Sequence, residues 1–61
     1  MESNFENAMN LLREKVEEHN KTQHWDDRRW ITAEIHGICK TLFLCNIINA
    51  EDWIAVEDLI K

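Results

Sequence analysis

Apolar residues occupy most of the circumference of a helix predicted between residues 30 and 45. At about 100° per residue, one broad stripe contains Ile31, Ile35, Ile38, Cys39, Leu42 and Cys45. A second stripe, roughly opposite the main polar positions, contains Trp30, Ala33, Gly37, Thr41 and Leu44. A helix that is apolar on most sides has to be covered on more than one side. Because the chain offers little else to cover it, this pattern predicts association.

An amphipathic helix is predicted over about residues 4–19. Ser3 followed three residues later by Glu6 is the pattern of a capping box. One stripe of the helix contains Phe5, Ala8, Met9, Leu12 and Val16, and His19 continues it. The opposite face is polar and contains Asn7, Asn10, Glu14, Glu17 and Glu18. We therefore expect one buried side and one side in water.

The central helix is predicted over about residues 24–45. Thr22 is a candidate N-cap, and Asp26 and Asp27 suit the positive end of the helix dipole. Gly37 is the only glycine of the chain and costs about 1 kcal/mol relative to alanine inside a helix. Close approach of another helix at Ala33 and Gly37 would account for it, and the alternative is a tolerated surface glycine.

A short third helix is predicted over about residues 50–60. Asn46 is suited to the left-handed conformation that ends many helices, and Asn49 with Asp52 is typical of a new N-cap. Ile47 and Ile48 would fill the turn. The apolar stripe of this helix contains Trp53, Val56 and Ile60, with Leu59 beside it and Ile54 off it.

The region of about residues 42–60 resembles the short C-terminal helical hairpins known as SHOCT domains. The matching positions are Leu42, Ile47, Ile48, Asn49, Glu51, Asp52, Trp53, Leu59 and Ile60. Asn46 replaces the usual glycine, and Val56 replaces a commonly basic residue. The resemblance covers about a third of the chain. It implies a small hairpin that mediates oligomerisation and brings no catalytic residues with it.

Length and composition predict one small domain, residues 1–61. A domain of about 60 residues is marginal alone and usually needs a disulfide, a metal or a partner subunit. Cys39 and Cys45 lie six residues apart in one predicted helix, so their α-carbons are about 9 Å apart, beyond disulfide reach. Two reduced thiols suit the cytoplasm. The N-terminus lacks the basic and apolar regions of a secretory signal, and no apolar run is long enough for a membrane span.

The net charge of −5, from 12 acidic and 7 basic side chains, argues against direct nucleic-acid binding. It favours a basic patch on another protein as partner.

Signals for metal or catalytic chemistry are weak, and we expect no enzyme, no metal site and no cofactor. His36 and Cys39 could share a helix face, but His19 and His24 span a loop at a spacing unlike a zinc pair. The apolar surroundings predicted for Cys39 make its thiol inert. With one glycine, no glycine-rich phosphate loop is possible. The plain interpretation is two core thiols and three partly exposed histidines.

The run from His24 to Trp30 is the most distinctive local motif. It contains the candidate partner- or ligand-binding residues Trp25, Arg28, Arg29 and Trp30. Trp and Arg are enriched at interface hot spots, and two copies of the run could also stack a base and bind phosphate. The alternative is structural: Trp30 packs on the first helix while both arginines pair with nearby acids.

The sequence thus predicts an all-α fold of three helices. The N-terminal helix packs along the central one, and the short C-terminal helix folds back as a hairpin. We expect a homodimer, or a higher oligomer, joined along the central helix. The predicted oligomer interface consists of Ala33, Gly37, Thr41 and Leu44.

The predicted function is that of a small, acidic, non-catalytic interaction protein of the cytoplasm. It would bind and inhibit a larger partner, as inhibitors encoded by phages and mobile elements do. One alternative is an oligomer that sequesters a small anionic ligand such as a nucleotide. Another is a DNA mimic, whose carboxylates would be Glu14, Glu17, Glu18, Glu51, Asp52, Glu57 and Asp58.

Overall fold

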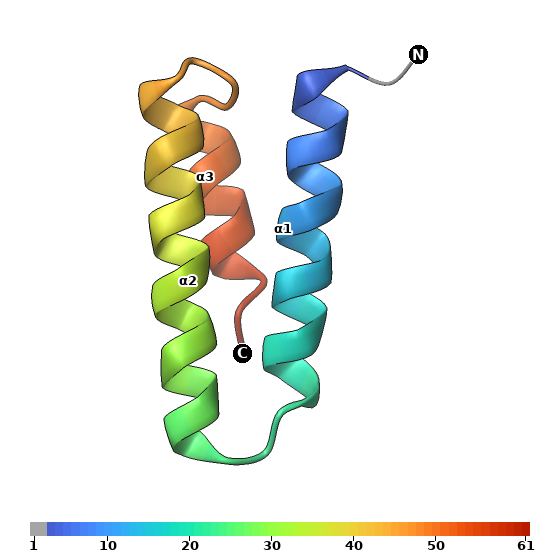
Figure 1. Ribbon diagram of the computed structural model, residues 1–61, viewed down its shortest axis with the longest axis vertical. Coiled ribbons are helices and arrows are strands. Elements are labelled where there is room, and N and C mark those ends of the chain that lie inside the picture. Colours follow the sequence, from blue (N-terminus) through green and yellow to red (C-terminus); the bar gives the residue numbers. More distant parts are fainter. Residues whose placement is uncertain (1–2) are drawn as a thin grey trace.

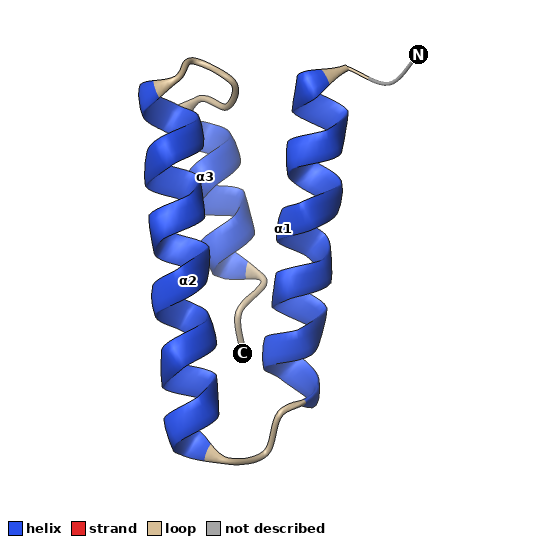
Figure 2. Cartoon of the chain, in the orientation of Figure 1, coloured by secondary structure: helices blue, strands red, loops and turns tan. Residues whose placement is uncertain are grey.

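The computed structural model describes residues 3–61, which form three α-helices and no strand (Figure 2). The helices are α1 (Asn4–Lys21), α2 (Trp25–Leu44) and α3 (Ala50–Asp58). The all-α, three-helix prediction is therefore confirmed.

The helix ends differ from the predicted ones by one or two residues. The first helix is longer than predicted and continues to Lys21, whereas the second begins at Trp25 and ends at Leu44. The third ends at Asp58, two residues early.

The three helices pack side by side, and each contacts the other two (Figure 1). Consecutive helices run in opposite directions, and α3 lies behind the gap between α1 and α2. With only nine residues, α3 is half as long as α1. The short tail 59–61 follows α3 and runs beside the C-terminal half of α1.

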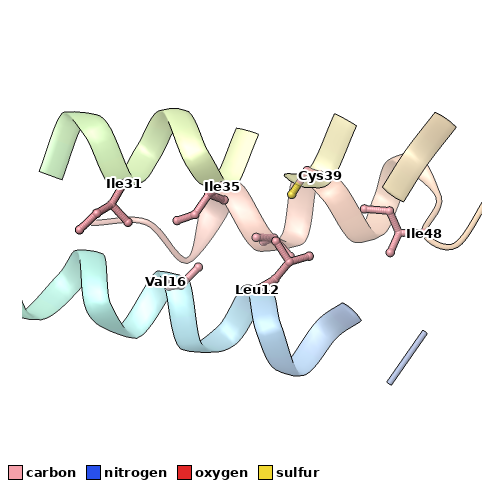
Figure 3. Packing of buried hydrophobic residues seen from close by; sticks show 7 residues of the cluster. Leu12, Val16, Ile31, Ile35, Cys39 and Ile48 are labelled. Atoms are coloured by element: carbon pink, nitrogen blue, oxygen red, sulfur yellow. The ribbon is translucent and has the colours of Figure 1, made fainter. Parts of the chain in front are cut away.

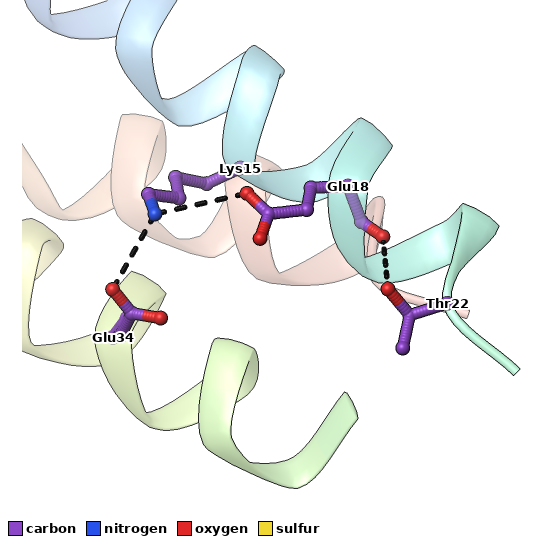
Figure 4. Close-up of polar contacts among 4 residues, drawn as sticks. All are labelled: Lys15, Glu18, Thr22 and Glu34. Atoms are coloured by element: carbon purple, nitrogen blue, oxygen red, sulfur yellow. Dashed lines mark hydrogen bonds and ion pairs between the residues drawn. The ribbon is translucent and has the colours of Figure 1, made fainter. Parts of the chain in front are cut away.

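Thr22 ends α1 rather than beginning α2, so its predicted role as N-cap is wrong. Its hydroxyl donates to the carbonyl of Glu18 at 2.7 Å (Figure 4), and its backbone N–H bonds to the same carbonyl at 3.1 Å. These bonds close the last turn of α1, which explains why the helix continues past His19. His24 has the extended backbone of an N-cap, but its side chain makes no cap hydrogen bond.

The predicted start signal of α3 is present in full, whereas only one half of the capping box predicted for α1 is formed. The Ser3 hydroxyl accepts from the Glu6 N–H at 3.1 Å. Asn49 and Asp52 form a full capping box: the Asn49 side chain accepts from the Asp52 N–H at 2.8 Å, and the Asp52 carboxylate accepts from the Asn49 N–H at 3.0 Å. In the preceding turn, Asn46 adopts the expected left-handed conformation with φ 60°.

One hydrophobic core lies between the three helices (Figure 3). Its buried members are Leu12, Val16, Ile31, Ile35, Cys39, Ile48 and Val56. The stripes predicted for the three helices supply all of these residues except Ile48. Ile48 lies in the turn before α3 and fills it together with Ile47, as expected.

Three predicted side-chain positions need correction, and one of them is Phe5, which was expected on the buried stripe of the first helix but is 43% exposed. Cys45 is exposed, because α2 ends at Leu44 and the backbone of Cys45 leaves the helical stripe. His19 is buried instead of partly exposed, because the extended α1 keeps it on the inner face. Its ring nitrogen Nδ1 is 2.9 Å from the Asn20 side-chain oxygen, so burial leaves it a polar partner.

Candidate functional site

A line of exposed residues runs along the side of α2 that faces away from the rest of the molecule. We call this line the α2 outer face; it consists of Trp30, Ala33, Gly37, Thr41 and Leu44, all exposed. At 100° per residue these positions fall within about 80° of arc. Its two large side chains are widely open to solvent, with Trp30 70% and Leu44 68% exposed.

The outer face is bare because α1 and α3 both pack on the opposite side of α2. Ile35, which is fully buried, lies about 160° around the helix from Gly37. Ile31 and Cys39 flank Ile35 in the same core. The core-facing side of α2 thus carries most of the contact with the other helices, and Trp30 and Leu44 of the second apolar stripe stay largely exposed.

Gly37 stands at the middle of the outer face in open space. Apart from the neighbouring backbone of its own helix, a Cβ atom placed there would meet no heavy atom within 4 Å. The carbonyl of Gly37 accepts a hydrogen bond from the Thr41 hydroxyl at 2.9 Å, which turns that polar group towards its own helix. A shallow groove beside the glycine is lined by Glu34, Gly37, Ile38, Thr41 and Leu42. No close approach by another element among residues 3–61 explains the glycine.

The four residues of the predicted Trp–Arg cluster point in different directions. Trp25 and Trp30, both largely exposed, lie about 140° apart around α2. Arg28 donates to the backbone carbonyl of Lys61 and so holds the C-terminal tail against the start of α2. Trp30 does not pack on α1, and the structural alternative is wrong on that point. The four side chains therefore do not line one pocket. The nucleotide-binding hypothesis stays a prediction, with no pocket formed by these residues to support it.

Arg29 lines a shallow groove between α2 and α3. The other residues of this groove are Thr32, Ala33, His36, Glu57 and Ile60. The Glu57 carboxylate lies 3.2 Å from His36 Nδ1 and accepts from Trp53 Nε1 at 2.9 Å. The His36 and Trp53 rings pack with centroids 5.4 Å apart.

Sequence reasoning missed this cluster, because α2 and α3 residues some 20 positions apart form it. Its only local signal was the four-residue spacing of Trp53 and Glu57 on α3. Because the carboxylate in it is already shared by two donors, the groove is better suited to joining α2 and α3 than to binding an anion.

Four of the seven carboxylates proposed for DNA mimicry have partners among the described residues: Glu17, Glu18, Asp52 and Glu57. Lys15 bridges Glu18 on its own helix, at 3.7 Å, and Glu34 on α2, at 3.4 Å (Figure 4). The hydrogen bond to Glu34 and the charge of Glu18 raise the pKa of Lys15. The hydrogen bond from Lys21 to Glu17, at 2.6 Å, lowers the pKa of that carboxyl. Paired carboxylates offer less negative charge to a basic groove, so the DNA-mimic hypothesis gains no support from this surface.

The described residues hold no group of three or more potential metal ligands. Burial, with a contribution from the charge of Glu57, raises the pKa of the Cys39 thiol and keeps it protonated at neutral pH. Of the two predicted core thiols, only Cys39 lies in the core. Within residues 3–61 no helix combines the length and the hydropathy that a bilayer crossing requires.

Comparison with known protein families, with curated proteins and with solved structures finds no match for this chain. The resemblance of residues 42–60 to SHOCT domains stays a prediction. Function is therefore argued from the exposed surface itself.

Proposed function

We propose that this protein is a small, non-catalytic interaction module that self-associates through the α2 outer face. The observation that carries the proposal is the exposure of Trp30 and Leu44 at the two ends of one bare helix face. Contiguous exposed apolar surface marks interaction sites in soluble proteins. The hairpin of α2 and α3, which resembles an oligomerisation module, would hold that face in place.

The energetic case rests on the two large side chains of the face. Full burial of a large apolar side chain is worth about 1.5–3 kcal/mol. Trp30 and Leu44 are each about two-thirds exposed in the single chain. Most of the free energy of burying them would therefore be gained only on association. The small core of a 61-residue chain makes such a gain significant, because domains of this size are marginal alone.

A second, larger protein is the proposed target of the assembled module. Trp25, 66% exposed at the start of α2, and Arg29 lie one turn apart and form an edge outside the outer face. Trp and Arg are the residue types that dominate interface hot spots. The exposed Glu14 on α1 and the net charge of −5 suit a basic patch on a cytoplasmic partner, as expected of an inhibitor of the phage-encoded kind.

The test of self-association compares two variants that add the same charge. Gly37→Glu places a carboxylate on the outer face where the single chain has open space, so the monomer fold is kept. Asn10→Glu adds a carboxylate to the exposed face of α1. We expect sedimentation to give a concentration-dependent dimer for wild type and for Asn10→Glu, and a monomer for Gly37→Glu.

Thermal unfolding supplies the second measurement, because association raises the apparent stability with protein concentration. The midpoint should rise with concentration in wild type and in Asn10→Glu but stay constant in Gly37→Glu. A wild-type chain that sediments as a folded monomer at every concentration, with a constant midpoint, would refute self-association.

A further inference from the structure

The residues of the α2 outer face are spaced symmetrically about Gly37. Trp30 and Leu44 lie seven residues on either side of it, and Ala33 and Thr41 lie four residues on either side. A two-fold axis that relates two antiparallel helices brings together positions at equal distances before and after the axis. We propose that the occupant of the outer face is a second copy of α2, antiparallel to the first, with the two-fold axis at Gly37. This inference rests on the proposed self-association.

The sizes of the side chains that would meet across the pair fit this arrangement at the axis, beside it and at both ends. At the axis, Gly37 meets Gly37 of the second copy, and on either side Ala33 meets Thr41, so small residues allow the two backbones to approach closely. At each end Trp30 of one copy covers Leu44 of the other, which removes both exposed side chains from water. The glycine, which no contact in the described part of the chain explains, is then explained by the crossing.

The charges beside the face favour the antiparallel orientation over the parallel one. In a parallel pair each residue lies level with its own copy, so Asp26 faces Asp26 and Lys40 faces Lys40 across the interface. Both residues lie on or beside the arc of the outer face at 100° per residue. In the antiparallel pair these like charges are separated. Lys40 then comes level with Glu34 of the second copy, a carboxylate that also binds Lys15 of its own chain, since both lie three residues from Gly37.

The footprint of the pair is small. From Trp30 to Leu44 the face is about 21 Å long at 1.5 Å per residue, and a helix with its side chains is about 10–12 Å wide. Such a contact is smaller than the roughly 800 Å² per partner of a standard interface. We therefore expect a dimer that dissociates on dilution into the micromolar range, as weak interfaces do.

Disulfide trapping tests the orientation, and it uses cysteines at the small positions so that the large side chains stay intact. In a Cys45→Ser background, Ala33→Cys and Thr41→Cys are prepared separately and then mixed under mild oxidation. The buried Cys39 does not compete, because its thiol is inaccessible. Asn10→Cys on the exposed face of α1 is the matched control for random collision.

We expect the mixture to give a covalent dimer that contains one copy of each variant, identified by mass. Each variant alone should give none, because two copies of residue 33 lie about 12 Å apart along the axes of an antiparallel pair. Self-linked dimers of each single variant would show a parallel pair and overturn this inference while leaving self-association intact.

Two other outcomes separate this inference from the proposed function. Absence of any cross-link at 33 or 41, in a sample that sediments as a dimer, would place the contact elsewhere and overturn the inference alone. Absence of both the cross-link and the dimer would overturn the proposed self-association as well. Circular dichroism of each variant verifies that the helices are retained.

Discussion

Cys39 and Cys45 show how strongly the surroundings determine the chemistry of a residue. Both were expected in the core, but only Cys39 is buried, whereas Cys45 is exposed just after the end of α2. Burial raises the pKa of the Cys39 thiol, because the charged thiolate loses its hydration there. The nearby charge of Glu57 acts in the same direction. This thiol is therefore a packing group rather than a nucleophile.

The raised pKa of Cys39 predicts that stability falls in alkaline solution. A group whose pKa is raised on folding contributes full stability below its unfolded pKa, which for a thiol is about 8.5. Above that pH the unfolded chain releases the proton while the folded chain holds it, so the free energy of unfolding decreases. Urea denaturation between pH 7 and pH 9.5 should show this decrease.

Matched variants identify the thiol responsible. Cys39→Ala should lose the alkaline decrease, although its absolute stability is lower because a cavity is created. Cys45→Ala should keep the decrease, because Cys45 is exposed. The same pH profile in all three proteins would contradict the assignment to Cys39.

At the scale of the element, the helix ends follow from local side-chain hydrogen bonds. The Ser3 hydroxyl begins α1, the Thr22 hydroxyl closes it, and the Asn49–Asp52 capping box begins α3. The last of these matters most for the shape of the molecule. Because α3 has only nine residues, it depends on its cap and on packing more than a longer helix does.

Replacement of the cap of α3 is predicted to destabilise the protein. Asn49→Ala removes the acceptor for the Asp52 N–H, and loss of an N-cap typically costs about 1 kcal/mol. Urea denaturation at one fixed protein concentration measures the loss. Asn46→Gly, three residues earlier, should be neutral or stabilising, because glycine adopts the left-handed conformation of this position without strain. A destabilisation by Asn46→Gly equal to that by Asn49→Ala would contradict this account of the turn.

At the scale of the whole molecule, one polar side chain fastens the end of the chain to α1. The Asn20 side chain donates to the carbonyl of Leu59 at 3.1 Å and accepts from the N–H of Lys61 at 3.2 Å. Arg28 at the start of α2 binds the Lys61 carbonyl. The tail that follows α3 thus joins two elements that lie far away in the sequence.

Asn20→Ala is predicted to release the tail and to destabilise the protein by about 1–3 kcal/mol, because it removes both hydrogen bonds to the tail and also the polar partner of the buried His19 ring. Asn10→Ala is the control, because it makes the same change at an exposed position of the same helix. Hydrogen exchange measured by NMR should show faster exchange of the Lys61 N–H in Asn20→Ala only. Unchanged protection of that N–H would show that Asn20 does not hold the tail.

The sequence by itself determined the three helices, most of the buried stripe of each, the left-handed Asn46 and the cap at Asn49. These features depend on side chains within about four residues of one another, where periodicity and local hydrogen bonds decide the conformation. Thr22 was misassigned for a related reason: a threonine between two helices can cap either one, and the local pattern does not choose between them.

Only the tertiary structure decided how completely the second apolar stripe of α2 is left open and whether the residues of the candidate Trp–Arg cluster lie together. Both stripes of α2 are apolar in the sequence, and it is the packing of α1 and α3 on one of them that leaves Trp30 to Leu44 open. Likewise, the contacts of Arg28 with the tail and of His36 with Glu57 join residues 33 and 21 positions apart. Burial is a property of the assembled surfaces, so spacing along one helix predicts which residues share a face but not which face meets water.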